Sequence, residues 1–133
     1  MKFCVVASGS KGNMTYIETK EARILIDAGI ALSDAQKRLP EINFSSITDI
    51  FITHEHNDHV RYLETIARKT RANIYMHKKA FENLPSKMKA ELKKHKISFI
   101  EENGQYQLKD FNLLTLGLSH DTASNLGYVF SSE

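Results

Sequence analysis

Short apolar runs separated by polar turns fill the first fifth of the chain. Residues 2–7, 14–19 and 23–27 are rich in β-branched and aromatic side chains and are bounded by Gly, Ser or charged residues, a pattern typical of strands. Because residues 20–22 form only a short polar link, the runs on either side must fold back on each other. We predict an antiparallel meander, with the Gly- and Ser-rich residues 8–13 as a loop.

The middle of the chain shows helical spacing between shorter apolar runs. Ser33-Asp34-Ala35-Gln36 has the form of a capping box, which predicts the start of a short helix. Val60, Leu63 and Ala67 recur at helical spacing. The predicted helices are residues 33–39, 58–71, 78–84 and 86–96, and the predicted strands between them are residues 47–53 and 73–76.

A second group of strands is predicted at the end of the sequence, in residues 97–100, 105–108, 111–118 and 126–130. Asn103-Gly104 is a strong turn signal between two of these runs. The order of elements predicts an α/β class with mixed and mostly antiparallel sheets. It matches one half of a four-layer α/β/β/α sandwich.

Length and composition are those of a soluble globular domain. The chain has 133 residues, 41% hydrophobic and 26% charged, which suffices for one domain with a real core. The net charge of +2 permits a polyanionic partner without requiring one. The single cysteine, Cys4, lies in an apolar run and excludes an intrachain disulfide. With no membrane-spanning run and no signal-peptide pattern, a cytoplasmic location is expected.

Most of the candidate metal-binding side chains lie in residues 53–59, Thr-His-Glu-His-Asn-Asp-His, which we call the histidine motif. His54 and His56 are two apart, so on extended backbone they point the same way. Asp58 and His59 follow where the chain is expected to turn into a helix. Imidazole nitrogens with a carboxylate suit zinc, manganese or iron better than calcium or magnesium. An exposed polar loop is the alternative, but this pattern after an apolar strand favours a metal site.

The arrangement HxHxDH after an apolar strand resembles the signature of the metallo-β-lactamase superfamily, a hydrolase fold with a two-metal site. Three further blocks resemble its YycJ (WalJ) branch, which is implicated as DNA exonucleases: residues 7–13 (ASGSKGN), 24–29 (ILIDAG) and 119–121 (SHD). The similarity runs along nearly the whole chain. It covers only about the first half of such a protein.

The resemblance implies a set of site residues. His54, His56 and His120 would bind a first divalent ion, and Asp58 and His59 would bind a second, with zinc or manganese as the candidates. Asp58 would also be catalytic, by accepting a hydrogen bond from the attacking water. Asp27 would lie beneath the metals and orient their ligands.

Two departures from the family pattern stand out. Tyr62 precedes Leu63 where the family usually has glycine, and this tyrosine would crowd the helix or narrow the pocket. The superfamily also supplies a bridging aspartate and a later histidine, neither of which is present before Glu133. Asp121 is a poor substitute because it adjoins His120. We therefore expect residues 1–133 to be a single domain of this class, truncated at its C-terminus.

Three hypotheses for function follow. The first is a metal-dependent hydrolase, a phosphodiesterase or DNA exonuclease acting through a two-metal-activated hydroxide, although the superfamily also includes lactamases, thioesterases, lactonases and ribonucleases. The second is a catalytically incomplete fragment that binds one metal or self-associates through an exposed sheet face. The third is a nucleic-acid-binding module that uses the lysine-rich residues 87–96.

The remaining polar features receive plainer interpretations. A solvated helix face is the favoured interpretation of residues 87–96, and His77 and His95, in lysine-rich surroundings, are expected at the surface. Residues 8–13 lack the spacing of a phosphate-binding loop and lead into a strand. A contribution of this loop to the rim of the active site is the remaining possibility.

Overall fold

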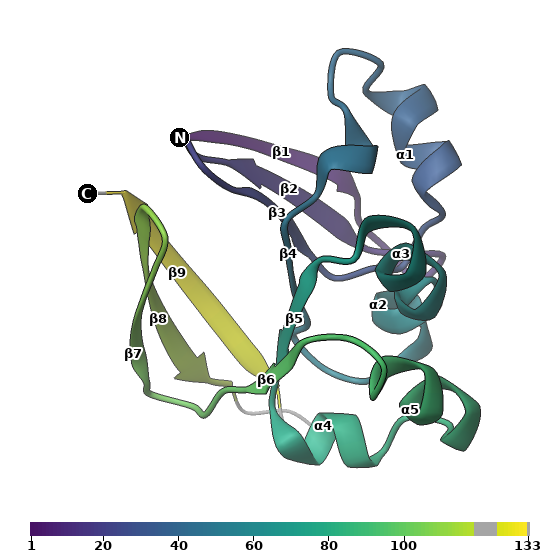
Figure 1. Cartoon of the computed structure of the whole chain (residues 1–133), viewed down its shortest axis with the longest axis vertical. Helices are drawn as coiled ribbons and strands as arrows, with labels where there is room; N and C mark the ends of the chain where they lie inside the picture. Colours follow the sequence, from purple (N-terminus) through teal and green to yellow (C-terminus); the bar gives the residue numbers. More distant parts are fainter. Residues whose placement is uncertain (119–124, 133) are drawn as a thin grey trace.

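The computed structural model describes residues 1–118 and 125–132. All helices of this part lie on one face of a six-stranded sheet, and a three-stranded sheet lies against the other face (Figure 1). The order of layers is therefore helices, first sheet, second sheet. These are three of the four layers that the sequence predicts for the whole sandwich.

The first sheet combines an antiparallel and a parallel half. Its strands, in spatial order, are β1 (Lys2–Ala7), β2 (Met14–Glu18), β3 (Arg23–Ile26), β4 (Asp49–Phe51), β5 (Asn73–Met76) and β6 (Ile97–Phe99). The strands β1, β2 and β3 pair antiparallel, which confirms the predicted meander. From β3 to β6 every pair is parallel. Parallel strands end at the same sheet edge, so the residues that follow β4, β5 and β6 gather there.

The helices are short. They are α1 (Leu32–Arg38), the 3-10 helix η1 (Phe44–Ser46), α2 (Asn57–Val60), α3 (Leu63–Thr70), α4 (Lys78–Glu82) and α5 (Ser86–Leu92). In α3, Leu63, Ile66 and Ala67 are buried and face the first sheet. No helix within residues 1–118 and 125–132 is long and apolar enough to span a bilayer.

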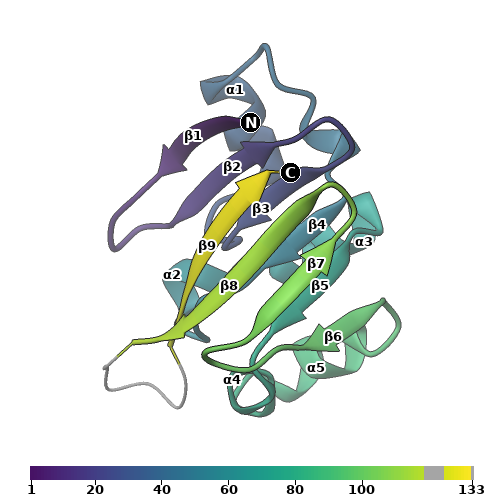
Figure 2. The same ribbon diagram turned by 90° about the vertical axis from the view of Figure 1, so that its left-hand side faces the viewer.

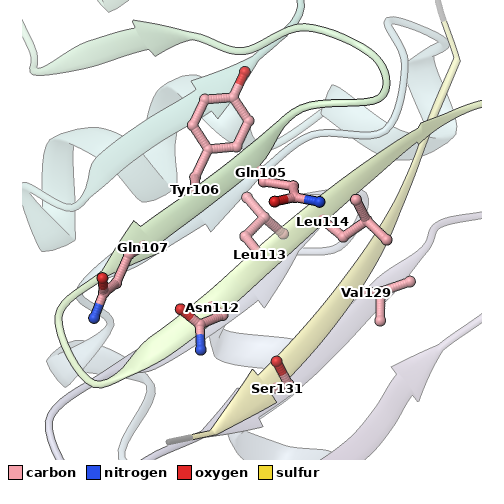
Figure 3. Close-up of a pocket in the computed structure, with 8 residues that line it drawn as sticks. All are labelled: Gln105, Tyr106, Gln107, Asn112, Leu113, Leu114, Val129 and Ser131. Atoms are coloured by element: carbon pink, nitrogen blue, oxygen red, sulfur yellow. The ribbon is translucent and has the colours of Figure 1, made fainter.

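The second sheet is an antiparallel meander of β7 (Gln105–Leu108), β8 (Phe111–Gly117) and β9 (Leu126–Ser132). It crosses over the middle of the first sheet (Figure 2). A hollow of about 460 Å³ lies on this sheet, and its lining includes Gln105, Asn112, Leu114 and Ser131 (Figure 3). Among the described residues, the lining has amide, hydroxyl and apolar side chains but no histidine or carboxylate. The chemistry therefore has to lie elsewhere.

Strand β4 is the centre of both hydrophobic cores. Ile50 faces the core beneath the helices, whereas Phe51 faces the core between the two sheets. The Phe51 ring stacks on Tyr75 with centroids 4.4 Å apart. It also presents edges to Tyr128 and Phe130 of β9, at 5.4 and 5.3 Å. Aromatic pairs of this kind add to the hydrophobic stabilisation, so Phe51 holds the second sheet in place.

The grouping of residues 97–100 with the later strands was wrong. Strand β6 pairs parallel with β5, with Ile97 opposite Ile74, and so completes the first sheet. The helices α4 and α5 supply the crossover that a parallel connection needs. The sequence of that segment shows a strand but does not show which neighbour it joins.

Several predicted helix boundaries also differ from the structure, among them the end of α5, which comes at Leu92 instead of residue 96. The predicted helix 58–71 is two helices, α2 and α3, separated at Tyr62, whose backbone N–H donates to the Ala28 carbonyl at 2.9 Å. The bond to Ala28 replaces an intrahelical one, so the helix breaks there. The predicted capping box is absent, because α1 has Ala31 at its N-cap and Ser33 lies within the helix.

Candidate metal centre

The histidine motif begins where β4 ends and runs into α2. Within it, His56 is the N-cap residue of α2, and Asp58 and His59 lie in its first turn. The ring centroid of His54 is 4.7 Å from that of His56 and 4.0 Å from that of His59. The structure thus brings the three imidazoles of the motif together at the carboxyl edge of the first sheet.

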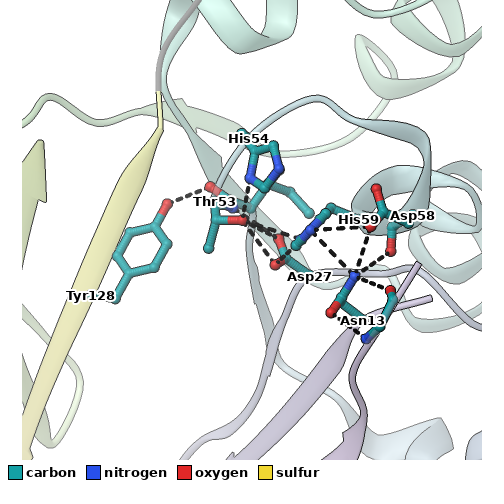
Figure 4. A network of polar contacts seen from close by, with 9 residues as sticks. Asn13, Asp27, Thr53, His54, Asp58, His59 and Tyr128 are labelled. Carbon is teal, nitrogen blue, oxygen red and sulfur yellow. Dashed lines mark hydrogen bonds and ion pairs between the residues drawn. The ribbon is translucent and has the colours of Figure 1, made fainter. Parts of the chain in front are cut away.

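Asp27 lies directly beneath this cluster. Its Oδ2 is 2.6 Å from Nδ1 of His59, and its Oδ1 accepts a hydrogen bond of 2.8 Å from the Thr53 backbone N–H. The Thr53 hydroxyl lies 2.9 Å from Oδ2 (Figure 4). The Asp27 backbone has φ 68° and donates to the Phe51 carbonyl at 2.7 Å. The backbone of Asp27 is therefore held by Phe51 of β4, and its carboxylate by Thr53 just after that strand.

The contact with Asp27 determines the electrostatics of His59. Burial lowers the pKa of this imidazole, but the hydrogen bond to Asp27, its negative charge and that of Asp58 together raise the pKa above its ordinary value. Because Nδ1 is held by Asp27, Nε2 is directed to the other side. There it lies 3.6 Å from Oδ2 of Asp58.

Asn13 joins the loop before β2 to the histidine motif. Its side-chain Nδ2 lies 3.1 Å from Oδ2 of Asp58 and 3.3 Å from Nε2 of His59. Its backbone N–H donates to the Asp58 carbonyl at 2.8 Å, and its carbonyl accepts from the Gly29 N–H at 2.9 Å. A contribution of this loop to the rim was one possibility from the sequence, but no role for Asn13 was predicted. The only signal was an asparagine after the turn-forming Gly12.

Gly29 permits this close approach of three segments. A Cβ atom at this position would lie 2.0 Å from the Asp58 carbonyl oxygen and 2.4 Å from the backbone nitrogen of Asn13. Both neighbours are backbone atoms and cannot move aside as a flexible side chain could. Glycine is therefore the residue that lets the chain after β3 pass beneath α2.

The donor atoms suit a small divalent cation. Two ligands at about 2.0–2.2 Å from a tetrahedral zinc ion lie about 3.4 Å apart, close to the 3.6 Å between Nε2 of His59 and Oδ2 of Asp58. Elsewhere in the motif, Oε1 of Glu55 is buried without a hydrogen-bond partner in the described part of the chain, and its Oε2 accepts from Asn83. Within residues 1–118 and 125–132, however, no three His, Cys, Asp or Glu side chains are grouped so that they could hold a metal.

The remaining predicted ligand, His120, lies outside the described residues. The described residues on either side of this segment are fixed near the motif. The Leu118 N–H donates to the Asn125 carbonyl, and the Leu126 N–H donates to the Thr53 carbonyl, both at 2.9 Å. The hydroxyl of Tyr128 donates to the Ile52 carbonyl at 2.5 Å. The start of β9 is thus fastened to the end of β4.

The other two histidines, His77 and His95, lie outside the motif and make local hydrogen bonds. His77 is the N-cap residue of α4, and its Nδ1 accepts from the Lys79 backbone N–H at 3.1 Å. The expectation that His95 is a surface residue was wrong, because its side chain is only 2% exposed. Its Nε2 lies 3.1 Å from Oε2 of Glu91, and this partner satisfies the buried ring.

The sequence matches the family model described as the metallo-beta-lactamase superfamily over residues 7–128. The fold and the site geometry agree with that match. The chain therefore belongs to the metallo-β-lactamase superfamily, whose members use divalent metal ions.

Two curated relatives are named as exodeoxyribonucleases. The chain is 35% identical over 139 residues to the exodeoxyribonuclease YycJ of Bacillus anthracis, covering 100% of this chain and 51% of the relative. It is 30% identical over 135 residues to the exodeoxyribonuclease WalJ of Streptococcus pneumoniae, covering 99% of this chain and 50% of the relative. The chain spans about half the length of the curated relatives it matches.

Solved structures show the same fold. The Rm3 metallo-β-lactamase superimposes with a TM-score of 0.74 at 16% identity, over 98% of this chain and 54% of that one. The metallo-β-lactamase GOB-18 from Elizabethkingia meningoseptica gives a TM-score of 0.72 at 20% identity, over 91% and 50% of the two chains. At this level of identity the likeness establishes the fold alone.

Proposed function

We propose that this chain carries the N-terminal part of a metal-dependent phosphodiesterase that acts as a DNA exonuclease with two divalent ions, zinc or manganese. The observation that carries the proposal is the 35% identity, along the whole chain, to a protein named as an exodeoxyribonuclease. The contacts among Asp27, Asp58 and His59 support it, because they join a carboxylate and an imidazole at the spacing of metal ligands.

The proposed ligands divide into two groups. His54, His56 and His120 bind the first ion, and Asp58 and His59 bind the second. The short distances between the rings of His54 and its two neighbours support the grouping. For His120 the support is the attachment of Leu126 to Thr53, which fixes the chain just beyond it beside the motif.

When bound, divalent ions at such a centre lower the pKa of water and stabilise charge on an attacked phosphate. The chain's own residues orient the reacting groups. The Asp58 carboxylate accepts a hydrogen bond from the attacking water and is itself held by the amide of Asn13. Asp27 holds Nδ1 of His59, so that Nε2 faces Asp58. Such outer partners fix ligand geometry.

The first test is the metal content of the purified chain, measured by elemental analysis. We expect about two ions per chain, with loss of both in the double variant His54→Ala/His56→Ala. His77→Ala is the matched control, because His77 caps α4 outside the motif and its loss should leave the metal content unchanged. A metal-free wild-type chain would contradict the proposal.

The second test is a nuclease assay on end-labelled DNA with added manganese or zinc. We expect shortening from the ends, abolished by a chelator and by Asp58→Asn. If the metal-loaded chain leaves DNA intact but cleaves a lactam, lactone or thioester, a different substrate class within the superfamily is correct and the exonuclease assignment is wrong.

A catalytically incomplete chain is the second candidate. The observation that favours it is the apolar surface of the second sheet, which is open to a second copy of the chain. It predicts about one ion per chain, no turnover, and self-association through the second sheet, where Leu116 and Val129 are exposed. Size-exclusion chromatography beside the two assays separates the candidates, since an active monomer with two ions contradicts this one.

A further inference from the structure

A hollow flanked by lysines lies between α4, α5 and β6. Its volume is about 440 Å³, and we call it the lysine groove. Its lining combines three lysines, one glutamate and three apolar side chains: Lys78, Lys89, Lys93, Glu82, Phe81, Ile97 and Phe99. The lining therefore carries net positive charge around an apolar floor, which differs from the uniformly solvated helix face favoured by the sequence.

The apolar floor includes an exposed aromatic ring. Phe99 is 45% exposed at the end of β6, whereas Phe81 beneath it is only 7% exposed. Their ring centroids are 5.4 Å apart at an interplanar angle of 62°. This edge contact holds Phe99 in place while leaving much of its surface open to solvent. A fixed, open aromatic ring among cations is the combination that proteins use for single-stranded nucleic acids.

The charges of the groove are arranged around α4 and α5. Lys78 begins α4 and is exposed, and Lys93 is the exposed C-cap residue of α5. The half-buried Lys89 donates from Nζ to the Glu82 carbonyl at 3.1 Å, which ties α5 to the end of α4. The exposed carboxylate of Glu82 is the one negative group of the lining. Its presence should weaken, without cancelling, the attraction for a phosphate backbone.

One end of the groove, at Lys78 and Phe99, lies at the same sheet edge as the candidate metal centre. Strands β4, β5 and β6 are parallel neighbours, and the histidine motif, Lys78 and Phe99 stand at their carboxyl ends. Two strand spacings amount to about 10 Å, a distance that a short single strand can span. The side chain of Asn83, which follows Glu82 of the groove in sequence, donates to Glu55 of the motif at 3.4 Å, so the end of α4 is linked to the motif.

We propose that the lysine groove binds a single DNA strand whose end lies at the candidate metal centre. Lys78, Lys89 and Lys93 contact phosphates, and a base stacks on Phe99. Stacking on an aromatic ring is available to every base, so we expect binding to depend little on sequence. The choice of DNA, and of a direction toward the motif, rests on the exonuclease function proposed above.

The test is fluorescence anisotropy with a labelled single strand of about 12 nucleotides, using the whole chain. A chelator is present throughout, so that DNA is not cut and binding is measured apart from catalysis. We expect the triple variant Lys78→Ala/Lys89→Ala/Lys93→Ala to weaken binding at least about tenfold at low salt. It should also reduce the slope of log K against log salt by about two, because each lost phosphate contact removes about 0.7.

The matched control is Lys2→Ala/Lys20→Ala/Lys37→Ala, which removes the same charge from exposed positions on β1, the turn before β3 and α1. Equal losses in the two triple variants would overturn the proposal. Phe99→Ala should weaken binding by at least about fivefold with an unchanged salt slope, and Phe99→Leu should behave similarly. Wild-type affinity in both would also overturn it.

The two assays together separate this proposal from the exonuclease function. If the wild-type chain binds the labelled strand in the chelator, the lysine groove variants weaken that binding, and no form of the chain cuts DNA, only the proposed catalysis fails. If the wild type cuts DNA and the lysine groove variants bind as tightly as the control, only the groove is wrong.

Discussion

Oδ2 of Asp27 lies 2.6 Å from Nδ1 of His59, which joins a residue at the end of β3 to one in the first turn of α2. This bond crosses 32 positions of sequence and determines the orientation of the imidazole. With Nδ1 occupied, Nε2 is the nitrogen that faces Asp58. Asp27 is therefore a positioning residue for the proposed metal ligand, and its effects on metal affinity and on stability can be separated by substitution.

Asp27→Asn should retain the fold but bind metal more weakly. Asparagine tolerates the left-handed backbone of this position, φ 68°, and keeps a side-chain oxygen for the Thr53 N–H. It loses the negative charge that attracts His59. We expect zinc affinity to fall roughly 10- to 100-fold, measured by isothermal titration calorimetry. Unchanged affinity would show that Asp27 does not orient the ligand.

Asp27→Ala and Asp27→Gly test the backbone at the same position. Both lose the carboxylate, but only alanine suffers the left-handed conformation, at a cost of about 1–2 kcal/mol. Urea denaturation should therefore find Asp27→Gly about 1 kcal/mol more stable than Asp27→Ala. An alanine variant as stable as the glycine variant would mean that the backbone relaxes there.

Gly29→Ala should destabilise the protein by about 3 kcal/mol or more, because its Cβ would collide with backbone atoms of Asp58 and Asn13. Gly127→Ala is the matched control, since its Cβ would lie 3.4 Å from the nearest atom, on Leu118, and should change stability by less than about 1 kcal/mol. Urea denaturation of the two variants measures the difference. Equal stabilities would contradict the close packing at Gly29.

The parts of this structure that depend on local pattern were predictable from the sequence. The meander of β1 to β3 follows from three apolar runs with tight links. The position of the histidine motif after a buried strand follows from the run that precedes it. Both features are encoded in the composition and periodicity of a few neighbouring residues, so they can be predicted without knowledge of the rest of the fold.

Features that depend on distant partners were not predictable in the same way. Strand β6 joins β5 because α4 and α5 return the chain parallel to it, and no property of residues 97–99 alone specifies that choice. Asn13 is 45 positions from Asp58 in sequence, and its role appears only when the loop is packed against α2. The burial of His95 was missed for a different reason: its partner Glu91 is only four residues away, but the lysines around His95 indicated a surface position.

Phe51→Ala should cost about 3–5 kcal/mol of unfolding free energy. The ring is completely buried between the sheets and contacts Tyr75, Tyr128 and Phe130, so its removal leaves a cavity where the second sheet is held. Phe51→Leu retains most of the apolar volume and should cost clearly less. Urea denaturation with the two variants side by side checks this order, and similar losses in both would show that aromatic stacking dominates over volume.

Glu91 offers a prediction on pH. Its carboxylate lies near His95, Lys94 and Arg68, at 3.1, 3.7 and 3.5 Å. The hydrogen bond to His95 is the largest influence and, with the two cations, it lowers the pKa of Glu91 below its ordinary value, although desolvation opposes this. A carboxylate with a lowered pKa in the folded state contributes stability above its unfolded pKa. That contribution is lost as the pH falls through the folded value.

Glu91→Gln should therefore lower the thermal midpoint more at about pH 7 than in acid below the folded pKa of Glu91, because the contribution of the charged carboxylate is lost as the pH falls. Glu41→Gln is the control, since Glu41 is exposed in the turn after α1 and its replacement should have little effect at either pH. Thermal melts followed by circular dichroism provide the comparison. If Glu91→Gln lowers the thermal midpoint equally at both pH values, the charge of Glu91 contributes nothing measurable and only the shape of its side chain matters.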